Sequence, residues 1–153
     1  MDELDNTDKQ LLRLLGEDSE ITIKELAIRV NLSHTPVFER VKKLKSSGYI
    51  KKYIALIDAE KLNYGLIVFV NIKLKQHDKS IGNEFVKDIL RLQEVVECYN
   101  ISGDFDFLLK VYAKDMKHYQ DFVFNKLGSV TSIGSTHSTF VMCENKNSYN
   151  INF

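Results

Sequence analysis

The first fifty residues of the chain carry apolar positions at the spacing of short amphipathic helices. The first stripe comprises Leu11, Leu12 and Leu15. Asp5 or Thr7 can cap the start of this helix, and Gly16 is placed to end it. The segment between these residues is therefore predicted to be the first helix.

Two further helices are predicted close behind the first. Thr22 and Glu25 have the spacing of a capping box in front of an apolar stripe. Asn31 can adopt the left-handed conformation that ends a helix, and the next helix is predicted to begin at Ser33 or Thr35 and to run to about residue 47. Two short helices joined by such a tight turn form a helix-turn-helix pattern.

After residue 50 the period of the apolar positions changes, and strands alternate with helices. Strands are predicted at residues 66–75, 95–101, 105–113 and 133–143, and helices at residues 80–92 and 115–127. The inward side of the last helix is predicted to carry Met116, Tyr119, Val123 and Leu127. The order β-α-β-β-α-β is that of the ferredoxin-like unit, with four antiparallel strands and two helices on one face.

The fold class that follows is α+β, in two domains. The domains are a three-helix helix-turn-helix domain at residues 1–50, a linking strand or hinge at 51–64 and a ferredoxin-like domain at 65–153.

The formal net charge of the chain is zero, but the charges are unevenly distributed. Residues 1–20 carry seven acidic and two basic side chains, whereas residues 21–53 carry eight basic and two acidic ones. The phosphate backbone of a nucleic acid is attracted by a local cluster of basic side chains rather than by the net charge of the whole chain, because salt screens charges that lie farther away than roughly 8 Å. The basic segment therefore favours a nucleic-acid partner in spite of the neutral total.

The third helix concentrates this positive charge on one side. On a wheel of about 100° per residue, Val37, Val41 and Leu44 share one side and must face the core. The outward side carries Thr35, Glu39, Lys42, Lys43 and Ser46, with Arg40 on its flank. A solvated helix surface is the simpler reading, but the cations coincide with the tight turn and continue into Lys51 and Lys52, which favours DNA.

The residue types that catalyse reactions or bind metals show no matching pattern. The four histidines share no ligand spacing and the two cysteines lie far apart, so neither a metal site nor a disulfide is predicted. Motifs for phosphate loops, dinucleotides and nucleophiles are missing from the sequence. Asp104 and Asp106 are two residues apart, so on a regular strand they would share a face like a carboxylate pair for acid–base catalysis. Carboxylates in turns, however, more commonly accept hydrogen bonds from their own backbone N–H groups.

The sequence predicts no membrane-spanning segment. The longest apolar run, Leu66 to Val70, is far too short to cross a bilayer. A cytoplasmic protein without a cofactor is therefore expected.

Four blocks of sequence, in a fixed order, carry a family resemblance. The blocks are L-D-x-x-D at Leu4 to Asp8, E-L-A-x-R-V-x-L-S at Glu25 to Ser33, R-V-K-K-L-x-x-x-G-Y-I at Arg40 to Ile50, and G-D-F-D-F-L-L-K at Gly103 to Lys110. Together they resemble the Lrp/AsnC family of leucine-responsive and asparagine-responsive regulators, over nearly the whole chain. Asn31 departs from the Gly of many members, but Asn reaches the same left-handed geometry.

The resemblance implies a transcription regulator without catalytic activity. Its first domain is expected to bind double-stranded DNA as a dimer, with Thr35 and Arg40 as candidates for contacts to base edges. The expected DNA-binding residues are Ser33, His34, Thr35, Glu39, Arg40, Lys42, Lys43, Lys51 and Lys52.

The second domain, called RAM in this family, is expected to drive assembly into dimers and octamers and to bind a small effector, commonly an amino acid. The expected effector residues are Ser102, Gly103, Asp104, Asp106, Ser138 and Thr139. A carboxylate can hold the ammonium of an amino acid, and backbone N–H groups at a Gly turn can hold its carboxylate.

Two other functions share this sequence pattern. Siroheme decarboxylases resemble the same fold family, but an enzyme of that kind needs no cationic recognition face. An architectural DNA-binding protein without an effector would have the same fold and the same basic face.

Overall fold

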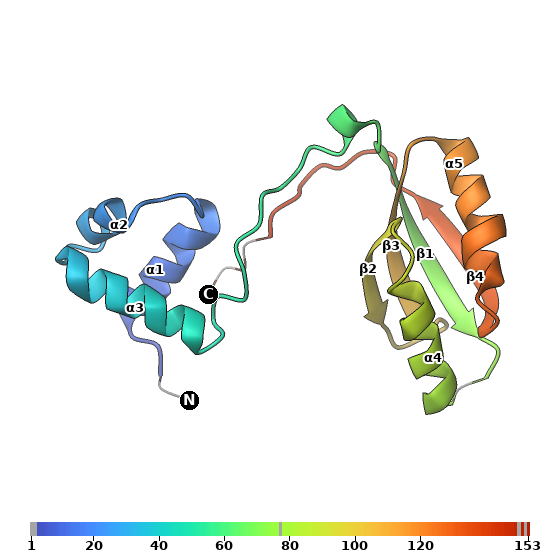
Figure 1. Cartoon of the computed structure of the whole chain (residues 1–153), viewed down its shortest axis with the longest axis horizontal. Coiled ribbons are helices and arrows are strands. Elements are labelled where there is room, and N and C mark those ends of the chain that lie inside the picture. The colour runs from blue at the N-terminus through green and yellow to red at the C-terminus, as the bar shows by residue number, and fades with distance from the viewer. Residues whose placement is uncertain (1–2, 77, 150, 152) are drawn as a thin grey trace. The chain divides into compact units, whose positions relative to one another are not determined.

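The computed structural model describes residues 3–76, 78–149, 151 and 153 (Figure 1). The chain divides into two compact units, of which the first comprises Met1–Leu56 with Lys146–Phe153 and the second Ile57–Asn145. The boundary thus falls inside the predicted hinge. The sequence-based division assigned residues 146–153 to the second domain, but in the structure they group with the first unit, where the Arg13 guanidinium lies 5.4 Å from the centre of the Phe153 ring.

The first unit contains three helices. They are α1 (Asn6–Glu17), α2 (Ile23–Arg29) and α3 (His34–Ser46). Their apolar sides form one core, in which Leu11, Leu26 and Val37 are fully buried. The predicted three-helix arrangement is confirmed.

The ends of these helices follow from local hydrogen bonds. Asp5 caps α1, because its carboxylate accepts from the Asp8 N–H at 2.8 Å while the Asp8 carboxylate accepts from the Asp5 N–H. Thr7 and Gly16 lie inside α1, so neither marks its start or its end as the sequence had suggested. The predicted capping box of α2 is present.

Asn31 makes the turn between α2 and α3. Its φ is +54°, in the left-handed region where Asn replaces Gly at low cost, as the sequence predicted. The Leu32 N–H then donates back to the Ala27 carbonyl at 3.0 Å, which closes the end of α2. This turn fixes the direction in which α3 leaves α2.

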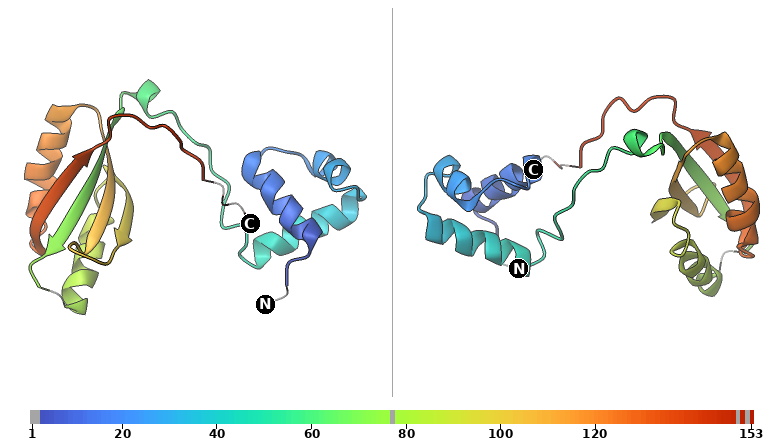
Figure 2. Two further views of the ribbon diagram at one scale, coloured as in Figure 1. Left: turned by 180° about the vertical axis from the view of Figure 1, so that it is seen from behind. Right: turned by 45° about the horizontal axis from the view of Figure 1, so that its top comes forward.

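The second unit is an antiparallel sheet with two helical segments. Its elements are β1 (Leu66–Leu74), α4 (Lys79–Ile89), β2 (Val95–Asn100), β3 (Phe107–Ala113), α5 (Met116–Asp121) and β4 (Ile133–Phe140). The strand order is β2-β3-β1-β4. Both α4 and α5 lie on one face of the sheet (Figures 1 and 2). The predicted ferredoxin-like α+β fold is confirmed.

The core of the second unit lies between the sheet and these helices. Val70 of β1 is fully buried and sits opposite Leu109 on β3 and Ser138 on β4. Phe85 of α4 is also fully buried, with its ring centre 4.5 Å from that of Phe107. Alternate residues of each strand therefore face the helices, and the others form an open face of the sheet.

The helix after β3 changes its geometry along its length. It continues from α5 into a π turn, η2 (Phe122–Lys126), and a 3₁₀ turn, η3 (Leu127–Ser129). A π turn holds more residues than an α turn, so the residues that follow it are rotated about the helix axis relative to an unbroken α-helix. The buried stripe runs through Tyr119, Phe122 and Leu127, while Met116 is 57% exposed. The prediction that Met116 faces inward was wrong: it is the first residue of α5 and lies before the π turn.

The segment between the two units is largely irregular. Residues 51–64 contain one 3₁₀ turn, η1 (Glu60–Leu62), and no strand. The linking strand expected there is therefore not formed within this chain, since a strand requires a neighbour for its backbone hydrogen bonds. Among the described residues, no helix is both long and apolar enough to cross a membrane.

Candidate DNA-binding surface and effector site

The exposed side of α3 is the candidate DNA-binding surface. The exposed residues on or beside it include Ser33, His34, Thr35, Glu39, Lys42 and Lys43, and the exposed Lys51 and Lys52 follow the helix. Ser33 is the N-cap of α3, so the three residues after it stand at the helix N-terminus. The first residues of a recognition helix are those that commonly reach base edges.

Arg40 stands apart from these residues, because two carboxylates hold it. Its Nη1 lies 2.6 Å from Asp5 Oδ2 and 2.7 Å from Asp8 Oδ1. The hydrogen bonds that Arg40 donates to the carboxylates of Asp8 and Asp5 raise the pKa of Arg40. The Asp8 backbone N–H and the Arg40 side chain hold the pKa of Asp5 below its ordinary value. Arg40 therefore joins α1 to α3. The prediction that Arg40 contacts base edges had not included these two ion pairs.

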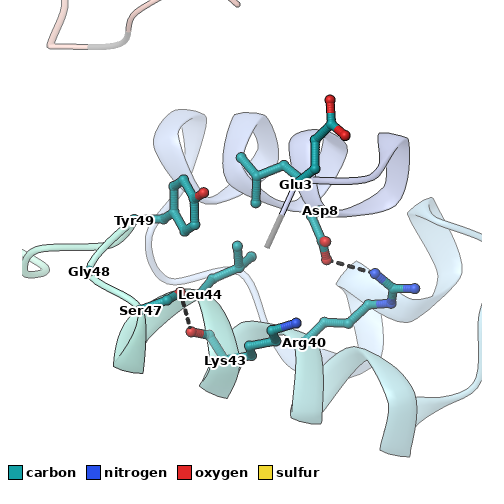
Figure 3. Close-up of a pocket in the computed structure, with 9 residues that line it drawn as sticks. Glu3, Asp8, Arg40, Lys43, Leu44, Ser47, Gly48 and Tyr49 are labelled. Carbon is teal, nitrogen blue, oxygen red and sulfur yellow. Dashed lines mark hydrogen bonds and ion pairs between the residues drawn. The ribbon is translucent and has the colours of Figure 1, made fainter. Parts of the chain in front are cut away.

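A hollow of about 290 Å³ lies beside this ion pair (Figure 3). Its lining comes from the start of the chain, α1 and the C-terminal half of α3, and comprises Glu3, Leu4, Asp8, Arg40, Lys43, Leu44, Ser47, Gly48 and Tyr49. Figure 3 shows that Arg40 reaches toward Asp8 and that Lys43 also borders the hollow. This flank of α3 therefore faces the N-terminal segment, while the opposite flank, with Thr35 and Lys42, is exposed.

The loop between β2 and β3 is the candidate effector site. Ser102, Gly103 and Asp104 are exposed on it. The φ of Gly103 is +116°, which a residue with a side chain rarely adopts. The predicted Gly turn is therefore required by the backbone, and the Asp104 carboxylate stands at the surface next to it.

Asp106 has a role within the sheet. Its Oδ2 accepts from the Leu74 N–H at 2.7 Å, at the irregularity in register between Lys73 and Leu74. The Asp106 N–H donates to the Ile72 carbonyl at 2.8 Å, and its own carbonyl accepts from the Ile101 N–H at 3.0 Å. The carboxylate thus connects the loop to the end of β1, whereas Asp104 is exposed, so the two carboxylates have different surroundings.

Strand β4 brings different side chains to this loop than the sequence suggested. Ser138 points to the helix side, where its hydroxyl lies 2.6 Å from that of Tyr119. Thr139 pairs with Phe69 and is exposed on the open face. His137 of β4 contacts the loop, with its ring centre 6.2 Å from that of Phe105. The sequence offered only one signal for His137, namely that it alternates with Thr139 on the same face.

The described residues contain no group of three or more His, Cys, Asp or Glu side chains that could hold a metal ion.

Comparisons with known families cover almost the whole chain. Residues 4–51 match the winged helix-turn-helix DNA-binding family, and residues 67–151 match the Lrp/AsnC ligand binding domain. The chain belongs to the Lrp/AsnC family of transcription regulators. The family and the function predicted from the four sequence blocks are confirmed.

Individual Lrp/AsnC relatives match over nearly their full length. The leucine-responsive regulatory protein of Escherichia coli is 37% identical over 146 residues, which is 95% of this chain and 89% of that protein. A transcriptional regulator of Neisseria meningitidis, solved as a complex with L-methionine, is 31% identical with a TM-score of 0.94, over 98% of this chain and 97% of that one. Escherichia coli AsnC is 26% identical with a TM-score of 0.87, over 95% and 96%.

Membership of the Lrp/AsnC family excludes the enzymatic function that the sequence had left open. The relatives are regulators, so this chain is a transcription regulator and not an enzyme of the siroheme-decarboxylase kind. It carries a DNA-binding unit and a ligand-binding unit.

Proposed function

We propose that this regulator binds operator DNA through the exposed side of α3 and that an amino acid, bound at the loop of residues 102–106, changes its activity. The observation that carries the proposal is the coexistence of two surfaces in one chain. One is a cationic helix behind a tight helix-turn-helix turn, and the other is an exposed carboxylate beside a left-handed Gly. Such a regulator works on the chromosome, in the cytoplasm.

The proposed DNA contacts fall into two groups, those to phosphates and those to base edges. Lys42, Lys51 and Lys52 supply cations that can contact phosphates, and such contacts contribute affinity without sequence preference. Thr35 and Glu39 lie one helical turn apart on the exposed side and can reach base edges. Arg40 acts indirectly, because its ion pairs with Asp5 and Asp8 orient α3 against α1.

The effector chemistry is that of a zwitterion. Asp104 offers a carboxylate to an ammonium group, and the backbone around Gly103 can offer N–H groups to a carboxylate. Thr139 and His137 lie on the same side of β4, and the contact of His137 with Phe105 brings that strand to the loop. The names of two relatives support the ligand class, since one is leucine-responsive and the other was solved with L-methionine.

The open face of the sheet supports self-association. Side chains on this face include Ile67, Phe69, Leu108 and Tyr112, all of them only partly buried within the chain. An apolar sheet face of this kind is expected to pack against a second copy, as sheets do when they stack. We propose a dimer through this face, and octamers assembled from dimers.

Thermal unfolding of the full chain with each of the twenty amino acids tests the effector proposal. A ligand that binds only the folded state raises its stability, by about 2.7 kcal/mol at a hundredfold excess over Kd. We expect one or a few amino acids to raise the melting temperature of the wild type but not of Asp104→Ala, whose DNA binding should persist. If none of the twenty has an effect, the amino-acid response is excluded; if Asp104→Ala still responds, the site lies elsewhere.

A further inference from the structure

Phe38 is an exposed aromatic side chain on the helix that faces DNA in the proposed function. It is 47% exposed although it is large and apolar. The ring of His34, one helical turn earlier, stacks on it with centres 6.5 Å apart and planes inclined by 7°. The DNA contacts proposed above are all polar or ionic, so they leave this apolar surface unexplained.

The position of Phe38 on α3 is defined by its neighbours. Residues three or four apart share a helix surface, so Phe38 adjoins Thr35 on one side and Lys42 on the other. Residues two apart point about 200° away from each other, so Phe38 lies on the flank opposite Arg40. Arg40 is held by Asp5 and Asp8 of the α1 region. Phe38 is therefore on the flank that the N-terminal segment leaves uncovered.

We propose that Phe38, braced by His34, contacts the C5 methyl group of a thymine in the major groove and so contributes to operator specificity. This inference rests on the proposed binding of DNA by α3. The thymine methyl is the apolar group that bases present in the major groove, and aromatic side chains are among those that contact it. The stacked His34 limits the rotation of the Phe38 ring, which keeps the ring available at one position.

The surroundings of Phe38 favour DNA over a protein as the occupant of this flank. Lys42 is exposed one turn away, and an apolar protein contact over Phe38 would bury this cation without a partner. A DNA groove accepts both side chains, because its walls are phosphates and its floor carries the methyl groups. The neighbouring cation therefore complements DNA and opposes an apolar partner.

Deoxyuridine substitution tests the contact. Duplexes that bind the full-length wild type are first enriched from a random pool, and each thymine of an enriched site is then replaced singly by deoxyuridine, which lacks only the methyl group. At the contacted thymine of each half-site we expect the wild type to bind the deoxyuridine duplex about fourfold more weakly, which corresponds to ~0.8 kcal/mol for one buried methyl group.

Variants assign that loss to Phe38. Phe38→Ala should bind thymine and deoxyuridine duplexes equally at this position, whereas Phe38→Leu, which keeps an apolar side chain, should retain part of the discrimination. His34→Ala should reduce the ratio of the two affinities, because the ring loses its brace. Lys42→Ala is the matched control: it should weaken binding to both duplexes while their ratio stays at about fourfold.

Two results would overturn the proposal in different ways. If the pool yields no enriched sequence, sequence-specific DNA binding fails and the thymine contact fails with it. If a site is enriched but Phe38→Ala and the wild type show the same thymine-to-deoxyuridine ratio at every position, only the role of Phe38 is wrong. Circular dichroism melting of each variant verifies that the helices remain folded.

Discussion

Replacement of Asp106 by Ala removes a single carboxylate that connects the β2–β3 loop to the end of β1. Asp106 Oδ2 accepts from the half-buried Leu74 N–H at 2.7 Å. The change leaves the backbone bonds of Asp106 to Ile72 and Ile101 in place. The variant therefore isolates the contribution of the side chain from that of the hairpin.

The expected loss is large enough to measure. A hydrogen bond to a charged group contributes about 1.5–3 kcal/mol, and Ala offers the Leu74 N–H no replacement. In a unit of this size each kcal/mol corresponds to about 4–8 °C, so the melting temperature of the second unit should fall by roughly 6–24 °C. Asp106→Asn keeps an acceptor oxygen and loses only the charge, so its loss should be about half as large.

Calorimetry and urea unfolding of the full chain measure these differences, and hydrogen exchange localises them. The Leu74 amide should exchange faster in Asp106→Ala than in the wild type. Asp104→Ala is the matched control, because Asp104 is exposed on the same loop and its removal should change stability by less than about 0.5 kcal/mol. The reasoning is refuted if both Ala variants melt at the wild-type temperature, or if Asp104→Ala is the less stable of the two.

Three further outcomes follow from the first unit. Lys42→Ala should weaken binding to all duplexes alike and reduce the slope of log affinity against log salt concentration by about 0.9. Filter-binding titrations at several salt concentrations measure this slope, and an unchanged slope would show that Lys42 does not contact a phosphate. The pKa of Asp5 is lower in the folded chain than its ordinary value, so its contribution to stability is present above that ordinary value and is lost as pH falls through the folded one. Urea unfolding at several pH values should therefore show the wild type losing more stability in acid than Asp5→Asn, and identical profiles would contradict this. Asn31→Ala should lose about 1–2 kcal/mol because of its left-handed backbone, whereas Asn31→Gly should be nearly neutral; equal denaturation midpoints for the two would argue against strain at this turn.

Local sequence signals predicted several local features of this chain correctly, although Thr7 and Gly16 proved to lie inside α1. The capping box at Thr22 and Glu25, the left-handed Asn31 and the Gly103 turn each depend on a few consecutive residues. These features depend on the backbone conformations and caps that particular residues favour, which can be read from a short stretch of sequence.

The incomplete predictions for Arg40 and Asp106 involve residues far apart in the chain. Arg40 looked available for DNA because a helical wheel contains only α3, whereas Asp5 and Asp8 reach it from another element. Asp106 looked equivalent to Asp104 because both belong to one short motif, yet only Asp106 meets the Leu74 N–H.

The sequence by itself determined the two-part organisation, the order of helices and strands, the concentration of positive charge near α3 and the resemblance to a family of regulators. The first three properties follow from periodicity, capping residues and composition, which act over a few residues at a time, and the resemblance rests on four blocks of sequence. Only the tertiary structure decided the surroundings of individual side chains: Arg40 holds α1 to α3, Asp106 holds a loop to β1, Ser138 faces a helix, and Phe38 remains exposed beside Lys42. The reason is that a charged or hydrogen-bonding side chain acts on whatever the folded chain brings within a few ångströms of it, and the sequence does not state those neighbours.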